Sequence, residues 1–179
     1  MARSIMFLSV LATAVLLSTV LPAGTSELAG FPPQGRATAE DSLAIVVNQS
    51  NPVDNLSLAE LRKVFLGETN HWSDGRRITV VMLEAGKLER QAVLTQIYKM
   101  DEKDFNNYFL HGMFTGEIHA APKTLATSAE VLKFVFNVPG AIGYLKGPEA
   151  DETVKVVRID GRLPSEKEYS IRFRAKPAK

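Results

Sequence analysis

The feature that most restricts the fold is a set of short apolar runs, rich in β-branched residues, separated by segments with helical spacing. The runs span residues 43–47, 78–82, 141–145 and 154–159. Runs of this length indicate strands, and the first, with no polar residue inside it, predicts a strand covered on both faces, as in parallel sheets. Because helical segments alternate with the strands, we predict an α/β fold with a mixed or parallel sheet flanked by helices.

Side chains that cap the backbone mark where the helices begin. The capping-box pattern, a Ser or Thr followed three residues later by Glu, occurs at Ser57–Glu60 and at Thr127–Glu130. The first of these helices is expected to end at Leu66, because Gly67 follows it. Two more helices are indicated by Asp101, which precedes an aromatic-rich segment, and by Gly86, which follows the second strand. We therefore predict helices that start near Ser57, Gly86, Asp101 and Ser128.

The N-terminus has the layout of a secretory signal. Arg3 precedes an apolar run from Ile5 to Leu21, and small residues suited to a signal peptidase follow it. We predict a signal peptide over residues 1–26, a flexible leader over residues 27–41, and a location in the periplasm or outside the cell. An uncleaved membrane anchor is the alternative, since the run nearly reaches the roughly 20 residues that a spanning helix needs.

The size and composition of the remaining chain fit a single domain. The 179-residue sequence contains no cysteine, so it has neither disulfides nor thiolate metal ligands. About 150 residues are enough for one domain of ordinary size, which we predict over residues 42–160. Residues 161–179 are expected to form a solvated, basic C-terminal tail. The net charge of +1 gives no general attraction to nucleic acid, and no nucleic-acid partner is expected.

Residues suited to catalysis are few and scattered. His71, His111 and His119 have no companion at ligand spacing, so we predict no metal site. The sequence shows no nucleophile elbow, no phosphate loop and no dinucleotide-binding turn, which predicts a protein that is not an enzyme and uses no cofactor. A hydrolase based on an acidic pair, such as Asp151 and Glu152, is a disfavoured alternative.

Two strings in the sequence, taken together, resemble a known family. The first is LSLAELRKVFLGE at residues 56–68, followed by WSDG at residues 72–75, and the second is PGAIGY at residues 139–144. In the same order, these strings are similar to those of the phosphate-binding components of bacterial ABC importers. The resemblance implies one lobe of a periplasmic-binding-protein-like fold. The large apolar residues in both strings also suit a core, so the strings identify a fold better than a function.

The resemblance also implies where an anion site would be built. In the family, the strand that matches residues 78–82 leads into an arginine and an Asp-Gly-Ser-Gly-Thr-like turn at a helix start, where amides and hydroxyls hold the anion. Here Gly86 keeps its identity, and Gly86 and Lys87 are the predicted ligand-binding residues. Leu83 replaces the arginine, Lys87 replaces the serine and Glu89 replaces the threonine. A carboxylate at this place repels an anion, so weak binding is expected.

Two functions remain open at this point. The first is an exported, non-catalytic solute-binding domain of the phosphate-importer type, with a small anion or another small solute as ligand and an ABC permease or an envelope protein as partner. The alternative is a periplasmic interaction or sensor-input domain that kept the fold and lost the ligand site.

Overall fold

The computed structural model describes residues 42–173, all within one unit of the chain, Gly35–Lys179. Its strands are β1 (Leu43–Asn48), β2 (Asn55–Leu56), β3 (Thr79–Leu83), β4 (Lys123–Leu125), β5 (Ala141–Lys146), β6 (Val154–Val156) and β7 (Arg158–Ile159). Its helices are α1 (Leu58–Leu66), α2 (Leu88–Val93), the π-helix η2 (Leu94–Tyr98), α3 (Glu102–Thr115), α4 (Ser128–Asn137) and the 3-10 helix η3 (Gly147–Glu149).

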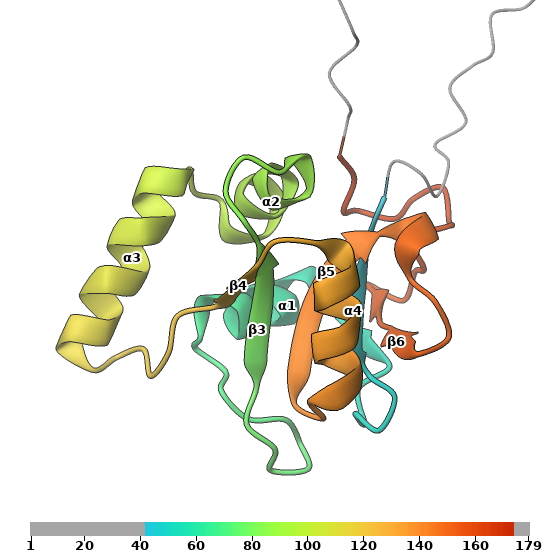
Figure 1. Cartoon of the computed structure of the whole chain (residues 1–179), viewed down its shortest axis with the longest axis horizontal. Coiled ribbons are helices and arrows are strands. Elements are labelled where there is room, and N and C mark those ends of the chain that lie inside the picture. Colours follow the sequence, from blue (N-terminus) through green and yellow to red (C-terminus); the bar gives the residue numbers. More distant parts are fainter. Residues whose placement is uncertain (1–41, 174–179) are drawn as a thin grey trace, which may run out of the picture. The chain divides into compact units, whose positions relative to one another are not determined.

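Five of the strands form one mixed sheet, in the order β4-β3-β5-β1-β6 (Figure 1). Strand β3 runs parallel to β4 and β5, whereas β1 runs antiparallel to β5 and β6. The predicted α/β fold with a mixed sheet and flanking helices is confirmed. All six residues of β1 are buried, as its apolar run indicates. Its neighbours are nevertheless antiparallel, because burial on both faces depends on the covering layers and not on strand direction.

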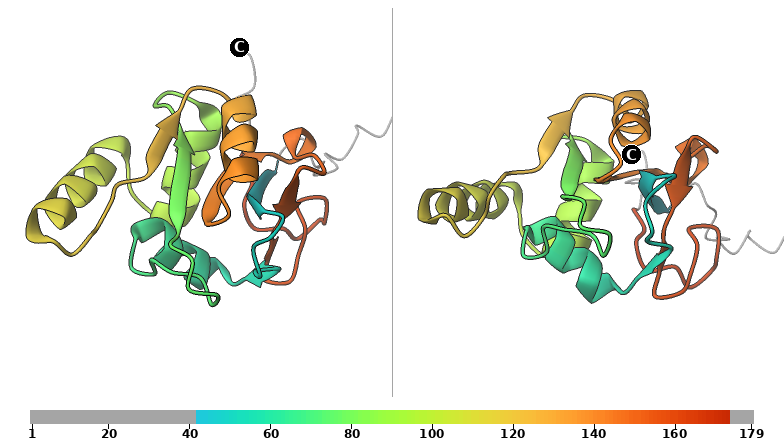
Figure 2. Two further views of the ribbon diagram at one scale, coloured as in Figure 1. Left: turned by 60° about the horizontal axis from the view of Figure 1, so that its bottom comes forward. Right: turned by 90° about the horizontal axis from the view of Figure 1, so that it is seen from below.

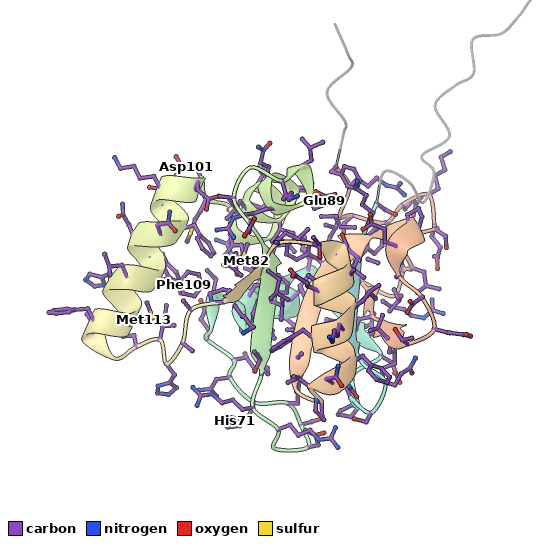
Figure 3. The ribbon with its side chains drawn as sticks, in the orientation of Figure 1. His71, Met82, Glu89, Asp101, Phe109 and Met113 are labelled. Carbon is purple, nitrogen blue, oxygen red and sulfur yellow. The ribbon has the colours of Figure 1, made fainter. Side chains whose placement is uncertain are left out.

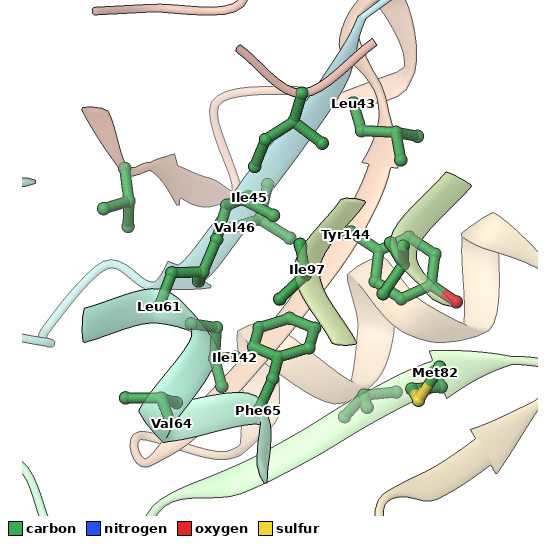
Figure 4. Close-up of a cluster of buried hydrophobic side chains, with 14 of the residues drawn as sticks. Leu43, Ile45, Val46, Leu61, Val64, Phe65, Met82, Ile97, Ile142 and Tyr144 are labelled. Carbon is green, nitrogen blue, oxygen red and sulfur yellow. The ribbon is translucent and has the colours of Figure 1, made fainter. Parts of the chain in front are cut away.

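Helices cover both faces of the sheet, with α4 on one side and α1 on the other (Figure 2). Alternation along β5 assigns its side chains to these two layers. Gly143 faces α4, since a Cβ atom at this position would lie 3.0 Å from Val131. Its neighbours Ile142 and Tyr144 point to the opposite layer, where Phe65 of α1 lies close to Ile142 (Figure 4). All of these side chains belong to one continuous buried core.

The capped helix starts form as expected. The Ser57 hydroxyl accepts from the Glu60 amide at 3.2 Å, and the Glu60 carboxylate accepts from the Ser57 amide at 2.8 Å. Thr127 caps α4 through the same reciprocal pair of bonds with Glu130. Gly67 ends α1 with a φ of 79°, in the left-handed region that favours glycine.

The helix expected after Gly86 begins at Leu88 and changes pitch within its length. Residues Leu88–Val93 are α-helical, and Leu94–Tyr98 continue as a π-helix. The next helix, α3, starts where its predicted cap lies, because the Asp101 carboxylate accepts from the Asp104 amide at 2.8 Å. Helices are therefore present at all four predicted starts.

The strand expected over residues 154–159 is divided into two. Its first half, β6, pairs with β1, and its second half, β7, pairs in parallel with the short strand β2. Between them, the Val157 amide donates to the Ile45 carbonyl at 2.9 Å and the Val157 side chain is buried. The apolar run is thus continuous, while its hydrogen-bond partners change along it.

The chain beyond Gly161 does not behave as a solvated tail. Tyr169, Ile171 and Phe173 are buried in the core, and the Leu43 amide donates to the Ile171 carbonyl at 3.0 Å. Arg172, which looked like part of a basic end, donates its guanidinium to backbone carbonyls of residues 166, 167 and 169. Up to Phe173 the expectation of a solvated tail is wrong, because alternate apolar residues there pack against β1.

The predicted signal peptide and leader, residues 1–41, lie outside the described residues. Within residues 42–173, none of the helices has the length and apolar character needed to cross a bilayer.

Candidate functional site

A hollow lies where the carboxyl ends of two parallel strands meet the first turns of two helices. Strands β3 and β4 end side by side, with Leu83 paired to Leu125, and they lead into α2 and α4. Next to them is a cavity of about 230 Å³, which we name the α2–α4 hollow. Its walls come from these strand ends, the two helix starts, and the end of β5 with η3: Leu83, Lys87, Glu89, Ala126, Thr127, Ser128, Lys146 and Glu149. Crevices at the carboxyl ends of parallel strands are common places for ligands.

The two residues predicted to bind the ligand are placed differently. Lys87 lines the hollow, precedes α2 in an extended conformation, and makes no capping hydrogen bond with its side chain. Gly86 is exposed, does not line the hollow, and has a φ of 90°. Its role is to let the backbone turn from β3 toward α2 in the left-handed region. Lys87 is therefore the member of the predicted pair with a side chain at the hollow.

Glu89 places a carboxylate in the wall of the hollow. Its side chain is only 10% exposed, and its Oε1 atom lies 3.1 Å from Nζ of Lys146, at the end of β5. The hydrogen bond and charge of Glu89 raise the pKa of Lys146 above its usual value. Glu89 therefore pairs with a positive charge that an incoming anion would need.

At the start of α4, side chains of the helix itself form hydrogen bonds with backbone amides. The Glu130 carboxylate accepts from the amides of Ala126 and Thr127 at 2.9 Å and 3.2 Å. The Thr127 hydroxyl accepts from the Glu130 amide at 3.2 Å. Amides of this kind bind anions at many helix starts, and here an internal carboxylate already uses two of them.

An arginine lies close to the end of β3 but points away from the hollow. Arg90 donates from Nη1 to the Leu83 carbonyl at 2.8 Å and makes a two-pronged pair with Glu102 of α3, with Nη2 to Oε1 at 2.6 Å. Its guanidinium also lies 5.0 Å from the centre of the Phe105 ring. Arg90 is 5% exposed, and this cation joins α2, β3 and α3.

The formal charges around the hollow are balanced. Lys87 and Lys146 face Glu89 and Glu149, with the hydroxyls of Thr127 and Ser128 beside them. Sequence reasoning identified Lys87 and Glu89 but missed Lys146, because its place beside Glu89 depends on how β5 pairs in the sheet. Thr127 and Ser128 were recognised only as a helix start. The arrangement can hold a small polar ligand, and an anion must compete with Glu89 for Lys146.

The remaining candidates for chemistry are dispersed over the surface. His71, His111 and His119 are exposed and lie on different segments (Figure 3 labels His71). Residues 42–173 contain no group of three or more histidine, aspartate or glutamate side chains that could hold a metal ion. A larger hollow of about 690 Å³ between α1 and α3 carries the carboxylates of Glu68, Asp104 and Glu117, which is unfavourable for an anion.

Comparisons in sequence and structure show that the chain is similar to phosphate-binding proteins. No family model matches the sequence. The phosphate-binding protein PstS of Bacillus subtilis is 29% identical over 126 residues, which cover 70% of this chain and 38% of that protein. The chain resembles the phosphate-binding proteins of ABC importers. It spans less than half of the length of this curated relative, as expected for about one lobe.

Solved structures show the same fold. An ABC-type phosphate transport receptor from Vibrio cholerae aligns with a TM-score of 0.56 and 23% identity, over 71% of this chain and 50% of the receptor. A putative phosphate ABC transporter substrate-binding protein with bound phosphate from Clostridium perfringens aligns with a TM-score of 0.54 and 24% identity, over 68% and 46%. PstS from Borrelia burgdorferi aligns with a TM-score of 0.58 and 15% identity, over 74% of this chain and 55% of that protein. At these identities the likeness shows a periplasmic-binding-protein-like fold.

Proposed function

We propose that this chain is an exported, non-catalytic solute-binding module of the phosphate-importer type, which holds a small oxyanion weakly in the α2–α4 hollow. The observation that carries the proposal is the meeting of two helix starts at a hollow that contains Lys87 and Lys146. The hydroxyls of Thr127 and Ser128 in the same wall add donors suited to phosphate or sulfate oxygens. The resemblance to phosphate-binding proteins supports the same ligand class.

The Glu89–Lys146 pair makes this binding weak. An arriving oxyanion gains charge-assisted hydrogen bonds from Lys87 and Lys146 only if it displaces the Glu89 carboxylate, which stays nearby and repels it. The arginine and hydroxyls expected from the resemblance are replaced by Leu83, Lys87 and Glu89. Two lost bonds of about 1.5–3 kcal/mol each turn a micromolar site into a millimolar one, since about 1.4 kcal/mol is tenfold in affinity.

The partner proposed for the module is a protein that supplies the opposite wall of the hollow. The match covers 38% of the curated relative and 50% and 46% of two solved relatives. An ABC permease or another envelope protein is the proposed source of this wall. Closure by a partner raises affinity when the second wall supplies hydrogen bonds that replace those of the ion with water.

Calorimetric titration with phosphate and with sulfate near pH 7 tests the proposal. The natural protein should bind with a dissociation constant of about 1 mM or weaker. Glu89→Gln keeps the shape of the side chain and releases Lys146, so phosphate affinity should rise about tenfold. Glu117→Gln makes the same change of charge outside the α2–α4 hollow and should leave affinity within about twofold.

The possible outcomes separate the hypotheses. Low-micromolar phosphate binding by the natural protein would show that Glu89 does not compete with the anion. If neither the natural protein nor Glu89→Gln binds either anion at 10 mM or so, the ligand site is lost. The alternative of an interaction or sensor-input domain then stands. Restoring the family's residues in a Leu83→Arg, Lys87→Ser, Glu89→Thr variant is a further check, because regained binding would place the deficit in these residues.

A further inference from the structure

The α2–α4 hollow lies across the carboxyl ends of three neighbouring parallel strands. In the order β4-β3-β5, strand β3 is central and runs parallel to both neighbours, so all three end at the same edge of the sheet. The turn after β4 supplies Thr127 and Ser128, and the turn after β3 supplies Lys87. The end of β5, with η3, supplies Lys146 and Glu149. Since neighbouring strands are about 4.8 Å apart, this wall is about 10 Å wide.

The two sides of the wall carry different groups. On the β4 side, the hydroxyls of Thr127 and Ser128 line the hollow. On the β5 side, the Oε1 atom of Glu89 lies 3.1 Å from Nζ of Lys146, so this carboxylate is turned toward β5 although it belongs to α2. Glu149 lies on the same side, in η3. The β5 side therefore has two carboxylates for one ammonium group.

Two of the four charged side chains in the hollow have no direct partner within residues 42–173. Lys87 and Glu149 form neither an ion pair nor a side-chain hydrogen bond there. The hydrogen bond and charge of Glu89, and less strongly the charge of Glu149, raise the pKa of Lys146. Glu149 is thus near Lys146, which already donates to Glu89. One cation after β3 and one carboxylate on the β5 side remain to be neutralised.

A ligand with a single charge fits only part of this arrangement. An anion can bind Lys87 and the hydroxyls, but it leaves Glu149 without a partner and is repelled by the carboxylates of the β5 side. A cation can bind Glu149, but it is repelled by Lys87. A ligand that carries both charges neutralises Lys87 and Glu149 together, and it leaves the Glu89–Lys146 pair intact.

We propose that the α2–α4 hollow selects a small zwitterion, with a sulfonate, phosphonate or phosphate group at one end and an ammonium group at the other. The inference rests on the proposed function, because it uses the same hollow and the same class of oxyanion. The oxyanion end binds Lys87, Thr127 and Ser128. The ammonium end binds Glu149.

The size of the hollow limits the spacer between the two charges. Charges joined by two carbon atoms are roughly one strand spacing apart, about 4–5 Å, which matches the step from the turn after β3 to the β5 side. The cavity of about 230 Å³ accepts a molecule of this length. It is smaller than the pockets that bind drug-sized ligands, so a short spacer is expected.

Taurine and propane-1-sulfonate are a matched pair of probes. A methyl group in the second replaces the ammonium group of the first, and the sulfonate carries a single negative charge in both. NMR titration of the purified protein near pH 7, at constant ionic strength, measures both dissociation constants in the millimolar range. Taurine should bind about threefold to tenfold more tightly. The backbone amides that respond should lie in residues 83–89, 126–128 and 146–149.

Variants assign each end of the ligand to its side chain. Glu149→Gln removes the partner of the ammonium group, so the two probes should then bind within about twofold of each other. Glu152→Gln makes the same change of charge at an exposed residue that does not line the hollow, and it should keep the preference for taurine. Lys87→Gln should weaken the binding of both probes, because both present a sulfonate.

The outcomes separate this inference from the proposed function. Equal binding of taurine and propane-1-sulfonate by the natural protein would overturn the selection of a zwitterion and leave the oxyanion site standing. Binding of phosphate or sulfate without binding of taurine would do the same. If none of these probes binds, the proposed function and this inference fail together. A preference for taurine that survives in Glu149→Gln would also overturn the inference, since the ammonium group would lie elsewhere.

Discussion

The sheet and helix α3 use their apolar residues in opposite ways. Every residue of β1 is buried, whereas α3 buries only Phe105, Phe109 and Gly112 among its fourteen residues. Helix α3 still carries large apolar side chains, but Leu110, Met113 and Phe114 face solvent. In the sheet, burial of apolar groups stabilises the fold. In α3, the exposed apolar side chains contribute little to the stability of the fold.

The contacts that join α3 to the sheet, here called the joint, are both polar and aromatic. Arg90 connects the end of β3 with Glu102 of α3, and Tyr98 lies against Phe105 and Phe109. The position of α3 thus depends on one buried cation and a small group of rings. Substitutions in the sheet, at the joint and on the outer face should therefore have effects that decrease in this order.

The largest effect is expected from Phe65→Ala in the core. Phe65 is fully buried and meets Tyr98 edge to face at 5.8 Å between ring centres. Its loss leaves a cavity, and the free energy of unfolding should fall by about 3–5 kcal/mol. Urea denaturation followed by far-ultraviolet circular dichroism measures this change. Phe65→Leu fills most of the space and should cost less than half as much, so equal losses would contradict a tightly packed core.

High pH should destabilise the core through its buried tyrosines. Burial raises the pKa values of Tyr98, Tyr144 and Tyr169, so in the folded protein they stay neutral above pH 10, while in the unfolded chain they ionise near pH 10. The unfolded state then holds fewer protons, and stability is complete below pH 10 and is lost as pH rises above it. Between pH 9 and 11 the free energy of unfolding should fall by roughly 4 kcal/mol.

Two tyrosine variants locate this pH dependence. Tyr144→Phe should reduce the loss by about a third, since one of three buried phenols is removed. Tyr108→Phe, on α3 and only partly buried, should have a much smaller influence on the slope. If Tyr108→Phe flattened the profile as much as Tyr144→Phe does, the contrast between core and helix would fail.

Arg90→Met should have an intermediate effect at the joint. The substitution leaves the Leu83 carbonyl without its buried donor and Glu102 without its partner, although Glu102 is 39% exposed and can be hydrated. We expect a loss of about 2 kcal/mol and weaker protection of α3 amides in hydrogen exchange. The control Arg158→Met removes a surface pair with Glu166, whose Nη1–Oε1 distance is 3.5 Å, and should cost below about 0.5 kcal/mol. Unchanged exchange in α3 would show that the rings alone hold the helix.

The smallest effect is expected from Phe114→Ala on the outer face. Because 91% of this residue is exposed in a single copy, its removal should change the free energy of unfolding by less than about 0.5 kcal/mol. A loss near that of Phe65→Ala would mean that the side chain is buried in solution.

Local signals in the sequence predicted the helices well. Ser57, Asp101 and Thr127 cap helices where their patterns indicated, because a cap depends only on residues within one turn. Strand pairing depends on distant residues, so neither the antiparallel neighbours of β1 nor the division of residues 154–159 could be predicted. The burial of Tyr169 and Ile171 was missed for the same reason.

The part of the candidate site that lies between β3 and the first turn of α2 could be predicted from the sequence. Lys87 and Glu89 were identified from the resemblance to the phosphate-binding family, and both line the hollow. Lys146 joins them from a strand more than fifty residues later in the sequence, and no motif marks it. Glu89 could be recognised as an unfavourable charge for an anion, but its neutralising partner required the sheet.

The central strand β1 comes first in the domain, and its partners come near the end. Ile45 pairs with Tyr144, Val46 pairs with Val156, and Leu43 bonds to Ile171. Contacts between such distant residues form slowly, because long loops must close first. A chain emerging from the ribosome therefore has no completed sheet until almost its whole length is made. Such a delay is compatible with the export proposed for this chain, because translocation pores that take unfolded polypeptides require the sheet to form late.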